Sequence, residues 1–284
     1  LYNIGTVQSS LEKRSEARSN LEEALSIFTK LDDKNELIPT LYSLSIVLDQ
    51  CDELDKAKIY LEEALENCRE LGENEWMAKI LFFQGVIQRK LGNDEETKLL
   101  LEEAKKIQFK LNDTEGLAKT LCELGNVLNG LGDHKGAVKH LKKALEIQRE
   151  LKDEKEIVWT LYSLGNVQSE LGKYKKARNH LAEALRIQRR IADKKATMKI
   201  LYKLGIVQGK LRKYKTAKHF LEEVLKNLDF NETEDKAATL FNLGTILDQL
   251  GDHEKARDYI KESLVIFKEL DKKPNIANAL LNLG

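Results

Sequence analysis

The chain has 284 residues, a formal net charge of zero, 33% charged and 42% hydrophobic residues, and only two prolines. This balance is typical of a soluble helical protein and excludes a disordered or fibrous chain. No apolar run approaches the roughly 20 residues that a membrane-spanning helix needs, so we expect no membrane segment.

A block of about forty residues recurs along the chain, and a period in this range predicts a solenoid. Its anchor leucines are Leu1, Leu41, Leu81, Leu121, Leu161, Leu201, Leu240 and Leu280. Four residues after each anchor stands a glycine, or once a serine, at Gly5, Ser45, Gly85, Gly125, Gly165, Gly205, Gly244 and Gly284. Because each repeat of a solenoid packs only on its neighbours, we expect function on a surface that several repeats share.

Each block is predicted to be a helical hairpin, as the fifth one illustrates. Residues 161–171 carry apolar side chains at steps of three and four, which indicates a helix. Gly172 and Lys173 interrupt the pattern, and residues 177–191 resume it as a second helix. The links between blocks hold aspartates suited to capping the helix that follows, at Asp33, Asp113, Asp153 and Asp193. No stretch alternates with the period of a strand, so we expect an all-α protein.

Small residues recur at fixed repeat positions and are expected to let the paired helices approach closely. One column is Ala17, Ala57, Thr97, Ala137, Ala177, Ala217 and Ala256. Glycine inside a helix costs ~1 kcal/mol relative to alanine. The recurrence of glycine at one helical position therefore predicts a packing role for it in each repeat.

The stretch LYSLGNVQSELGKYKKARNHLAEAL at residues 161–185 resembles the tetratricopeptide repeat, in the forty-residue variety of kinesin light chains, spindle-orientation adaptors and NB-ARC-type sensor arrays. The resemblance implies a right-handed α-solenoid superhelix over residues 1–284. It has about seven repeats, starting near residues 1, 41, 81, 121, 161, 201 and 240, and the start of an eighth near residue 280. Both ends fall inside the pattern, so we expect a fragment of a longer chain that carries other domains.

The sequence holds no combination of residues that predicts catalysis. The histidines form no pair at metal-ligand spacing, and the Glu-Glu pairs recur at one repeat position, as a solvated helix face does. We therefore expect a non-enzyme without cofactor or metal. Cys51 and Cys122 occupy mostly apolar columns and are interpreted as small buried thiols of a reducing, cytoplasmic compartment.

A binding face is predicted on the first helix of each repeat. In the fifth repeat, Tyr162, Asn166 and Ser169 share one side of the helix, which in tetratricopeptide arrays lines the concave side. Tyr162 belongs to a mostly aromatic column, which either provides contact area for a partner or packs between adjacent first helices. By the same resemblance, Asn126 and Asn166 match part of a peptide-binding asparagine ladder, because an amide both donates and accepts hydrogen bonds. The predicted partner-binding residues are Tyr42, Phe82, Arg89, Asn126, Asn129, Tyr162, Asn166, Ser169, Lys199, Tyr202, Lys210 and Phe241.

Charge is unevenly distributed, because residues 172–219 hold 16 basic and 2 acidic side chains. This segment either attracts an acidic partner or is neutralised by acidic neighbours. Nucleic acid is disfavoured as a partner, because the basic residues are scattered around both helices and no reading element is evident.

These features together predict a non-catalytic scaffold that binds a peptide or protein segment, acidic at one end, on the concave face. Two alternatives stay open: the sensor and oligomerisation arm of a signal-transducing STAND-type nucleotidase, and a peptide-pheromone receptor. A GxxxxGKT/S loop upstream in the full gene would favour the nucleotidase.

Overall fold

The computed structural model describes residues 1–11, 13–228 and 233–283, and every regular element in these ranges is an α-helix. This confirms the predicted all-α class and the helical repeat array. The helices belong to two compact units, Leu1–Leu151 and Lys152–Gly284, which are described one at a time. Gly284, the last glycine of the predicted column, lies outside the described residues. A single superhelix over residues 1–284 stays a prediction.

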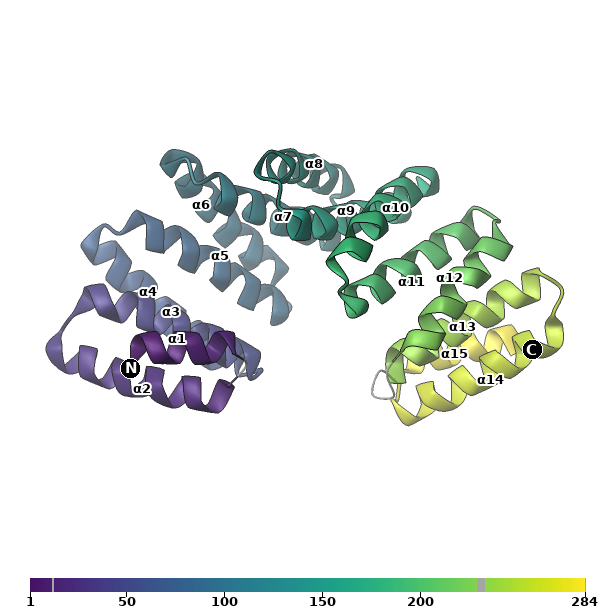
Figure 1. Cartoon of the computed structure of the whole chain (residues 1–284), viewed down its shortest axis with the longest axis horizontal. Coiled ribbons are helices and arrows are strands. Elements are labelled where there is room, and N and C mark those ends of the chain that lie inside the picture. The colour runs from purple at the N-terminus through teal and green to yellow at the C-terminus, as the bar shows by residue number, and fades with distance from the viewer. Residues whose placement is uncertain (12, 229–232, 284) are drawn as a thin grey trace. The chain divides into compact units, whose positions relative to one another are not determined.

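Each repeat of the first unit contributes a first helix and a second helix. The first helices are α1 (Tyr2–Ser10), α3 (Lys34–Gln50), α5 (Asn74–Lys90) and α7 (Thr114–Gly130). The second helices are α2 (Arg14–Leu31), α4 (Leu54–Leu71), α6 (Asp94–Leu111) and α8 (His134–Leu151). Figure 1 shows these hairpins following one another from α1 onward.

The second unit repeats the same hairpin. Its first helices are α9 (Glu154–Glu170), α11 (Lys194–Lys210), α13 (Thr233–Gln249) and α15 (Lys273–Leu283). Its second helices are α10 (Tyr174–Ile191), α12 (Tyr214–Asn227) and α14 (His253–Glu269) (Figure 1).

The predicted aspartate caps are confirmed. In α9, Oδ1 of Asp153 accepts a hydrogen bond from the backbone N–H of Glu156 at 3.2 Å. The same contact recurs at Asp33, Asp113 and Asp193. A cap of this kind satisfies an amide that otherwise has no partner at a helix start. The first helix of the fifth repeat therefore begins at Glu154, ahead of its anchor leucine, and it ends before Gly172, whose φ of 68° suits glycine.

The glycine column fits its predicted packing role. A Cβ added to Gly165 would lie 2.5 Å from Cγ of Leu181, and one added to Gly125 would lie 2.5 Å from Cγ of Leu141. Both leucines are fully buried on the paired second helix. Without side chains at these glycines, the two helices of a hairpin come close enough for the leucine to fill the space between them.

Consecutive first helices of a unit also pack on one another, as α3 does on α5 and α9 does on α11. The second helices make their main backbone contacts with the first helices that precede and follow them, as far as the described residues show. The first helices therefore form the more closely spaced layer of each unit. We call the side of this layer that points away from the second helices the first-helix face.

The cysteines depart in part from the sequence interpretation. Cys122 and Cys68 are buried thiols, and burial raises the pKa of Cys68 to about 11. Cys51, in contrast, is exposed, so the prediction of a buried thiol there is wrong. The physical reason is its position, because Cys51 caps the C-terminal end of α3 in a turn rather than lying on the packed side of that helix.

Candidate functional site

The first-helix face carries a continuous row of partly exposed side chains. On α9 this row is Trp159, Tyr162, Asn166 and Ser169, at steps of three and four residues. Such steps place side chains on one side of a helix. The predicted face of this helix is therefore accessible, and it includes an indole that the sequence interpretation did not select.

In the first unit, the aromatic members of the predicted site mainly pack within the protein. The Tyr42 ring lies 5.6 Å from the ring of Trp76 and 5.7 Å from that of Phe83, both at edge-to-face angles. Burial raises the pKa of Tyr42, and the Lys119 cation acts in the opposite direction. Phe82 is half-buried against the core. The alternative of rings that pack between adjacent first helices therefore holds for Tyr42.

The predicted Arg89 forms an ion pair on the first-helix face. Its Nη2 lies 3.2 Å from Oε2 of Glu123, whose side chain is only 15% exposed. Burial raises the pKa of Glu123, while the Arg89 cation and the neighbouring Asn126 amide act in the opposite direction. Asn129 interacts with His134, since its Oδ1 lies 2.8 Å from Nδ1 of the ring. The polar face of the first unit is thus largely engaged in internal interactions.

In the second unit, the aromatic side chains are more accessible. Trp159 is 43% exposed, and its ring stacks on that of Tyr162 at 5.9 Å with an interplanar angle of 22°. Burial raises the pKa of Tyr162, the Asn166 amide opposes this, and the Asp235 carboxylate reinforces it. The Oδ1 atom of Asn166 is buried and has no hydrogen-bond partner among the described residues.

The other predicted aromatic residues of this unit lie on α11 and α13. The hydroxyl oxygen of Tyr202 accepts a hydrogen bond from Nδ2 of Asn242 at 3.0 Å. Burial and the Asp235 carboxylate raise the pKa of Tyr202, and the Asn242 amide opposes them. Phe241 packs against the core around Ile260. Tyr202 therefore lies near the open part of the face, whereas Phe241 contributes mainly to the core.

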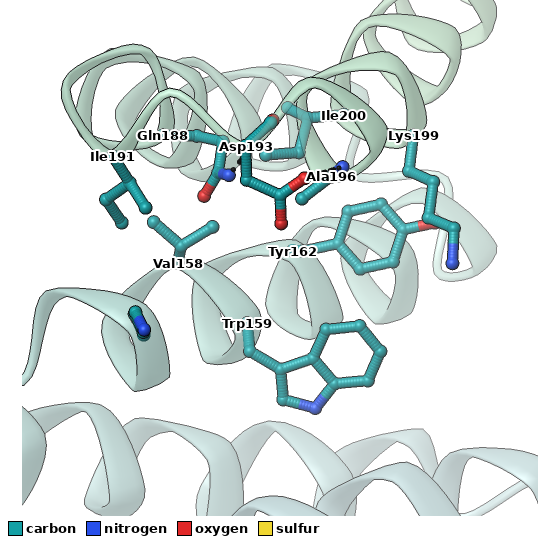
Figure 2. Close-up of a pocket in the computed structure, with 10 residues that line it drawn as sticks. Val158, Trp159, Tyr162, Gln188, Ile191, Asp193, Ala196, Lys199 and Ile200 are labelled. Atoms are coloured by element: carbon teal, nitrogen blue, oxygen red, sulfur yellow. Dashed lines mark hydrogen bonds between the residues drawn. The ribbon is translucent and has the colours of Figure 1, made fainter. Parts of the chain in front are cut away.

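A cavity of about 480 Å³ lies between α9, α10 and α11, and we call it the Trp159 cavity. Trp159 and Tyr162 form one of its sides, as Figure 2 shows. Its apolar lining consists of Val158, Ile191, Ala196 and Ile200. A space of this size, with stacked rings on one side and aliphatic groups behind, is suited to an apolar or aromatic group.

Gln188 adds a polar atom to this cavity. The side chain is 3% exposed, and its Nε2 donates a hydrogen bond to the backbone oxygen of Asp193 at 3.3 Å. Because a carbonyl oxygen can only accept, this bond fixes which end of the amide faces Asp193. The amide oxygen then points the other way, toward Val158 and the space between the helices (Figure 2).

A second cavity of about 300 Å³ adjoins the first one along α11 and extends toward α13. The residues common to both cavities are Trp159, Tyr162 and Lys199. Tyr202 and Asp235 line the second cavity only. The predicted residues Tyr162, Lys199 and Tyr202 are thus brought together in one groove.

Lysines surround this groove. Lys155 and Lys199 line the first cavity, and Lys195, Lys199 and Lys203 line the second. The acidic lining residues are Asp193 and Asp235.

None of the four lysines forms an ion pair with another described residue. Other cations of residues 172–219 are partly neutralised, since Arg189, Arg190 and Lys218 pair with Glu223, Glu154 and Glu222. The basic segment is therefore partly neutralised on its second helices and open at the groove.

The first unit has a cavity at the same repeat position, which we call the Lys79 cavity. It measures about 320 Å³, and its lining residues are Tyr42, Lys79, Phe82, Gln108, Asp113, Glu115, Gly116 and Lys119. Here Lys119 pairs with Glu115 at 2.6 Å, and Nζ of Lys79 lies 4.9 Å from the ring centroid of Trp76. The lysines of this cavity are thus engaged with neighbouring side chains.

Some predicted residues lie away from the groove. Lys210 lies in the last turn of α11 and lines neither of the two cavities that form the groove, and neither does Ser169. Sequence reasoning missed Trp159 and Gln188. A signal for Trp159 was present, because it stands three residues before Tyr162 in a column where Lys79, Lys119 and Lys199 occupy other repeats.

The comparisons with known proteins identify the fold. A family model described as tetratricopeptide repeat matches residues 1–70, 116–190 and 235–284. The chain belongs to the tetratricopeptide repeat family. A search of curated protein sequences found no match.

Solved tetratricopeptide-like structures resemble the chain over most of its length. The apo form of RapI is 19% identical, with a TM-score of 0.72, and the match covers 95% of this chain and 97% of RapI. A Rap protein complexed with competence and sporulation factor is 17% identical, with a TM-score of 0.67 and coverages of 95% and 78%. A STAND protein with a tetratricopeptide repeat sensor, from Pyrococcus horikoshii, is 17% identical, with a TM-score of 0.65 and coverages of 96% and 47%. At these identities the similarity concerns the fold. None of the described helices is both long and apolar enough to cross a membrane.

Proposed function

We propose that the chain is a non-catalytic scaffold that binds a peptide or protein segment along its first-helix face. The observation that carries this proposal is the groove of the second unit, where Trp159 is exposed beside Tyr162 and Lys199. Exposed aromatic side chains give a partner large contact area at a low cost in side-chain entropy. An indole that is exposed in this way contributes little to the hydrophobic core.

The amides of the face supply polar recognition. Asn166 has an amide oxygen without a partner among the described residues, and Asn126 occupies the same repeat position in the first unit. A peptide backbone offers N–H and C=O groups that such amides can bind. Lysines at the groove favour a segment that is acidic at one end.

A peptide-receptor role is a second candidate, favoured by the similarity to a Rap protein that was solved in complex with competence and sporulation factor. The STAND sensor from Pyrococcus horikoshii gives the nucleotidase-arm alternative the same kind of support, because its match covers nearly all of this chain and about half of that protein. For both candidates we propose that the ligand is recognised on the first-helix face, so one experiment tests the shared element.

The test uses the partner captured from the native source and isothermal titration at two salt concentrations. We expect Asn126→Ala combined with Asn166→Ala to weaken binding by ~0.5 to 1.5 kcal/mol for each amide that contacts the partner. Lys199→Glu combined with Lys210→Glu is expected to act mainly on the association rate and on the salt dependence.

A matched control places the same charge changes on second helices, as Lys142→Glu combined with Lys175→Glu. Both of these side chains are exposed on α8 and α10. We expect this control to bind like wild type. Wild-type binding by both first-helix double variants, together with loss of binding in the control, would show that the partner uses another surface.

A further inference from the structure

We propose that the chain pairs with a second copy of itself through the second helices of its first unit. In this pair, α4 of each copy lies in an apolar, lysine-rimmed cleft between α6 and α8 of the other. The inference goes beyond the proposed function, because the surface involved lies on the second helices and leaves the first-helix face free. Two features of the first unit carry it: the cleft itself and an acidic strip on α4 that is complementary to it.

The cleft measures about 320 Å³ and lies between α6, α7 and α8; we call it the Phe109 cleft. Its apolar lining consists of Phe109, Leu117 and Leu121. The two leucines are buried on α7, whereas Phe109 is 69% exposed on α6. The rest of the lining is basic and consists of Lys105, Lys106, Lys110 and Lys143. An exposed ring beside an apolar floor is suited to receive an aliphatic side chain from another molecule.

The cleft exists because its residues depart from the repeat pattern. Lys105 stands in a column that is otherwise leucine, at Leu25, Leu65, Leu145, Leu185, Leu225 and Leu264. The Lys105 ammonium group pairs with Glu102 on the same helix, so no branched apolar side chain covers Leu117 and Leu121. Phe109 likewise replaces the arginine found at Arg69 and Arg149. These two departures open the cleft and place an apolar ring at its edge.

A third departure reverses the charge at the rim. Lys143 stands in a column that is otherwise glutamate, at Glu23, Glu63, Glu103, Glu183, Glu223 and Glu262. Lys106, Lys110 and Lys143 form no ion pair with another residue of the described ranges. In the second unit, Arg189 and Glu223 occupy the positions of Phe109 and Lys143, and they form an ion pair at 3.5 Å. The Phe109 cleft therefore keeps a positive rim where the second unit has a paired one, and it attracts carboxylates.

The exposed side of α4 offers the complementary chemistry. What we call the α4 strip consists of Ile59, Glu62, Glu63 and Glu66, at steps of three and four residues, which places them on one side of the helix. The Ile59 side chain is 59% exposed. Glu63 and Glu66 have no ion-pair partner among the described residues, and burial and the Glu66 carboxylate both raise the pKa of Glu63. An aliphatic side chain beside uncompensated carboxylates matches a cleft with an apolar floor and a lysine rim.

The order of the helices lets two copies pair reciprocally. The helices α4, α6 and α8 follow one another as the second helices of consecutive repeats (Figure 1). A twofold axis that runs alongside α6 therefore brings the α4 strip of each copy onto the Phe109 cleft of the other. Glu63 and Lys143 share one repeat position, so this axis places them at the same height along the helices. Because such an interface closes on itself, we expect a dimer rather than a filament.

Analytical ultracentrifugation of the full chain, over a range of protein concentrations at low salt, measures the association. We expect a reversible equilibrium between monomer and dimer. The dimer should weaken as salt is raised, because lysine–carboxylate pairs at the rim are screened. A chain that stays monomeric at every concentration, or that grows into open-ended species, would overturn the inference.

A charge exchange tests whether α4 occupies the cleft. Lys143→Glu removes a cation from the rim, and Glu63→Lys removes a carboxylate from the α4 strip, so each should weaken the dimer about 10-fold or more. Combined in one chain, the two changes recreate the pair with its signs reversed and should return the affinity to within about 3-fold of wild type. If the combination does not restore association, α4 is not the occupant. Lys175→Glu, an exposed change on α10 that alters the net charge equally, should leave the dimer unchanged.

Two further variants test the cleft without relying on the charge pair. Lys105→Leu restores the leucine of its column, so it should fill the space above Leu117 and Leu121. We expect it to weaken the dimer about 10-fold or more while the midpoint of thermal unfolding stays the same or rises. Phe109→Arg introduces the residue that the same position has at Arg69 and Arg149, and it should also weaken the dimer. Circular dichroism verifies folding. Wild-type association in both folded variants would show that the copies meet at another surface.

The outcomes are distinguishable from those of the proposed function. Partner binding along the first-helix face is expected to survive Lys143→Glu and Lys105→Leu, and the dimer is expected to survive Asn126→Ala combined with Asn166→Ala. A monomeric chain that loses its captured partner through Lys143→Glu would show that another protein occupies the cleft. A monomeric chain that sediments with phosphatidylserine vesicles, and does so less after Lys143→Glu, would show that the cleft serves a membrane surface. Either result would overturn the pairing of two copies.

Discussion

The Trp159 cavity and the Lys79 cavity occupy the same place in two different repeats, and the residues that form their framework are nearly the same. Each has a buried glutamine at the end of a second helix and an aspartate that caps the next first helix. They differ at the exposed positions. Trp159 replaces a lysine, and Lys195 replaces the glutamate that neutralises Lys119.

This difference separates residues that order the backbone from residues that vary at the surface. The glutamine recurs at Gln108, Gln148 and Gln188, and the capping aspartate recurs at Asp33, Asp113, Asp153 and Asp193, where each orders the local backbone. Exposed positions on the first helices contribute little to packing and are free to vary. One indole and one reversed charge are enough to change an internally neutralised cavity into an open, basic and aromatic one. The predictions below test whether the framework is equivalent in the two units and whether the difference lies in these exposed positions.

The largest effect is expected for substitutions in the shared framework. Gly125→Leu and Gly165→Leu each place a side chain where a Cβ alone would lie 2.5 Å from a buried leucine Cγ. Overpacking of this kind is expected to lower the free energy of unfolding by ~1 to 3 kcal/mol in either unit, as measured by urea denaturation.

Gly172→Ala is a useful control for the packing effect. Gly172 lies in a turn with a φ of 68°, and a Cβ there would meet no atom within 4 Å. This substitution is expected to lower the free energy of unfolding by ~1 kcal/mol, through backbone strain alone. If Gly125→Leu and Gly165→Leu cost no more than this control, the close approach of helices does not depend on the glycine column. A large cost in one unit only would show that the two frameworks are not equivalent.

The sequence predicted the fold well because the fold depends on the framework. Leucine, glycine, alanine and the aspartate caps repeat in register, and each has a local physical effect that can be recognised without coordinates. The site was predicted in part. Tyr162, Lys199 and Tyr202 line one groove. They could be predicted because the aromatic column and the excess of basic residues can both be read from the linear sequence.

The remaining site residues were missed for physical reasons. Trp159 shares its repeat position with Pro39, three lysines and Ala238 and has no aromatic counterpart there, so only its exposure in three dimensions distinguishes it. Gln188 falls within the apolar pattern of residues 177–191, and its role in the cavity depends on the direction of its amide group, which the sequence does not show. The ion pair between Arg89 and Glu123 links two helices from different repeats, a contact that no spacing within one helix predicts.

An intermediate effect is expected for Arg89→Ser, which gives the first unit the residue found at the same repeat position in the second unit, Ser169. The substitution leaves the Glu123 carboxylate, 15% exposed, without its cation. We expect the free energy of unfolding to fall by about 1 to 2 kcal/mol at neutral pH, a moderate value because the Arg89 side chain is itself one-third exposed.

The pH dependence of this variant follows from the raised pKa of Glu123. Burial raises this pKa already in the wild type, and removal of the Arg89 cation raises it further. The loss of unfolding free energy caused by Arg89→Ser is therefore greatest above the folded-state pKa of Glu123, where the carboxyl group is charged. This loss disappears as the pH falls through that pKa toward the ordinary glutamate pKa of ~4.3, because the carboxyl group becomes neutral. Urea denaturation at neutral pH and near pH 4 measures the change. A destabilisation by Arg89→Ser that is independent of pH, or that persists after Glu123→Gln is added, would contradict this electrostatic origin.

The smallest effect is expected for the charge that distinguishes the two cavities. Lys195→Glu places a carboxylate in the first turn of α11, four residues before Lys199, as Glu115 precedes Lys119 in α7. A glutamate there interacts with the helix dipole and pairs with the lysine, so we expect a gain of about 0.5 to 1 kcal/mol in the free energy of unfolding. Glu115→Lys should lower the free energy of unfolding by a similar amount.

Each change is also measured in a background in which the neighbouring lysine is replaced, by Lys199→Met or Lys119→Met. The difference between the two backgrounds isolates the ion pair, which is expected to contribute about 0.3 to 0.5 kcal/mol. The gain should also shrink at high salt, because both groups are exposed to solvent. If Lys195→Glu does not raise the free energy of unfolding, the open lysines of the Trp159 cavity do not lower stability, and charge repulsion there is already relieved by other means. If Lys195→Glu stabilises the chain and Glu115→Lys destabilises it, the second unit maintains its basic entrance at a cost in stability, which is expected where exposed charge serves recognition of a partner.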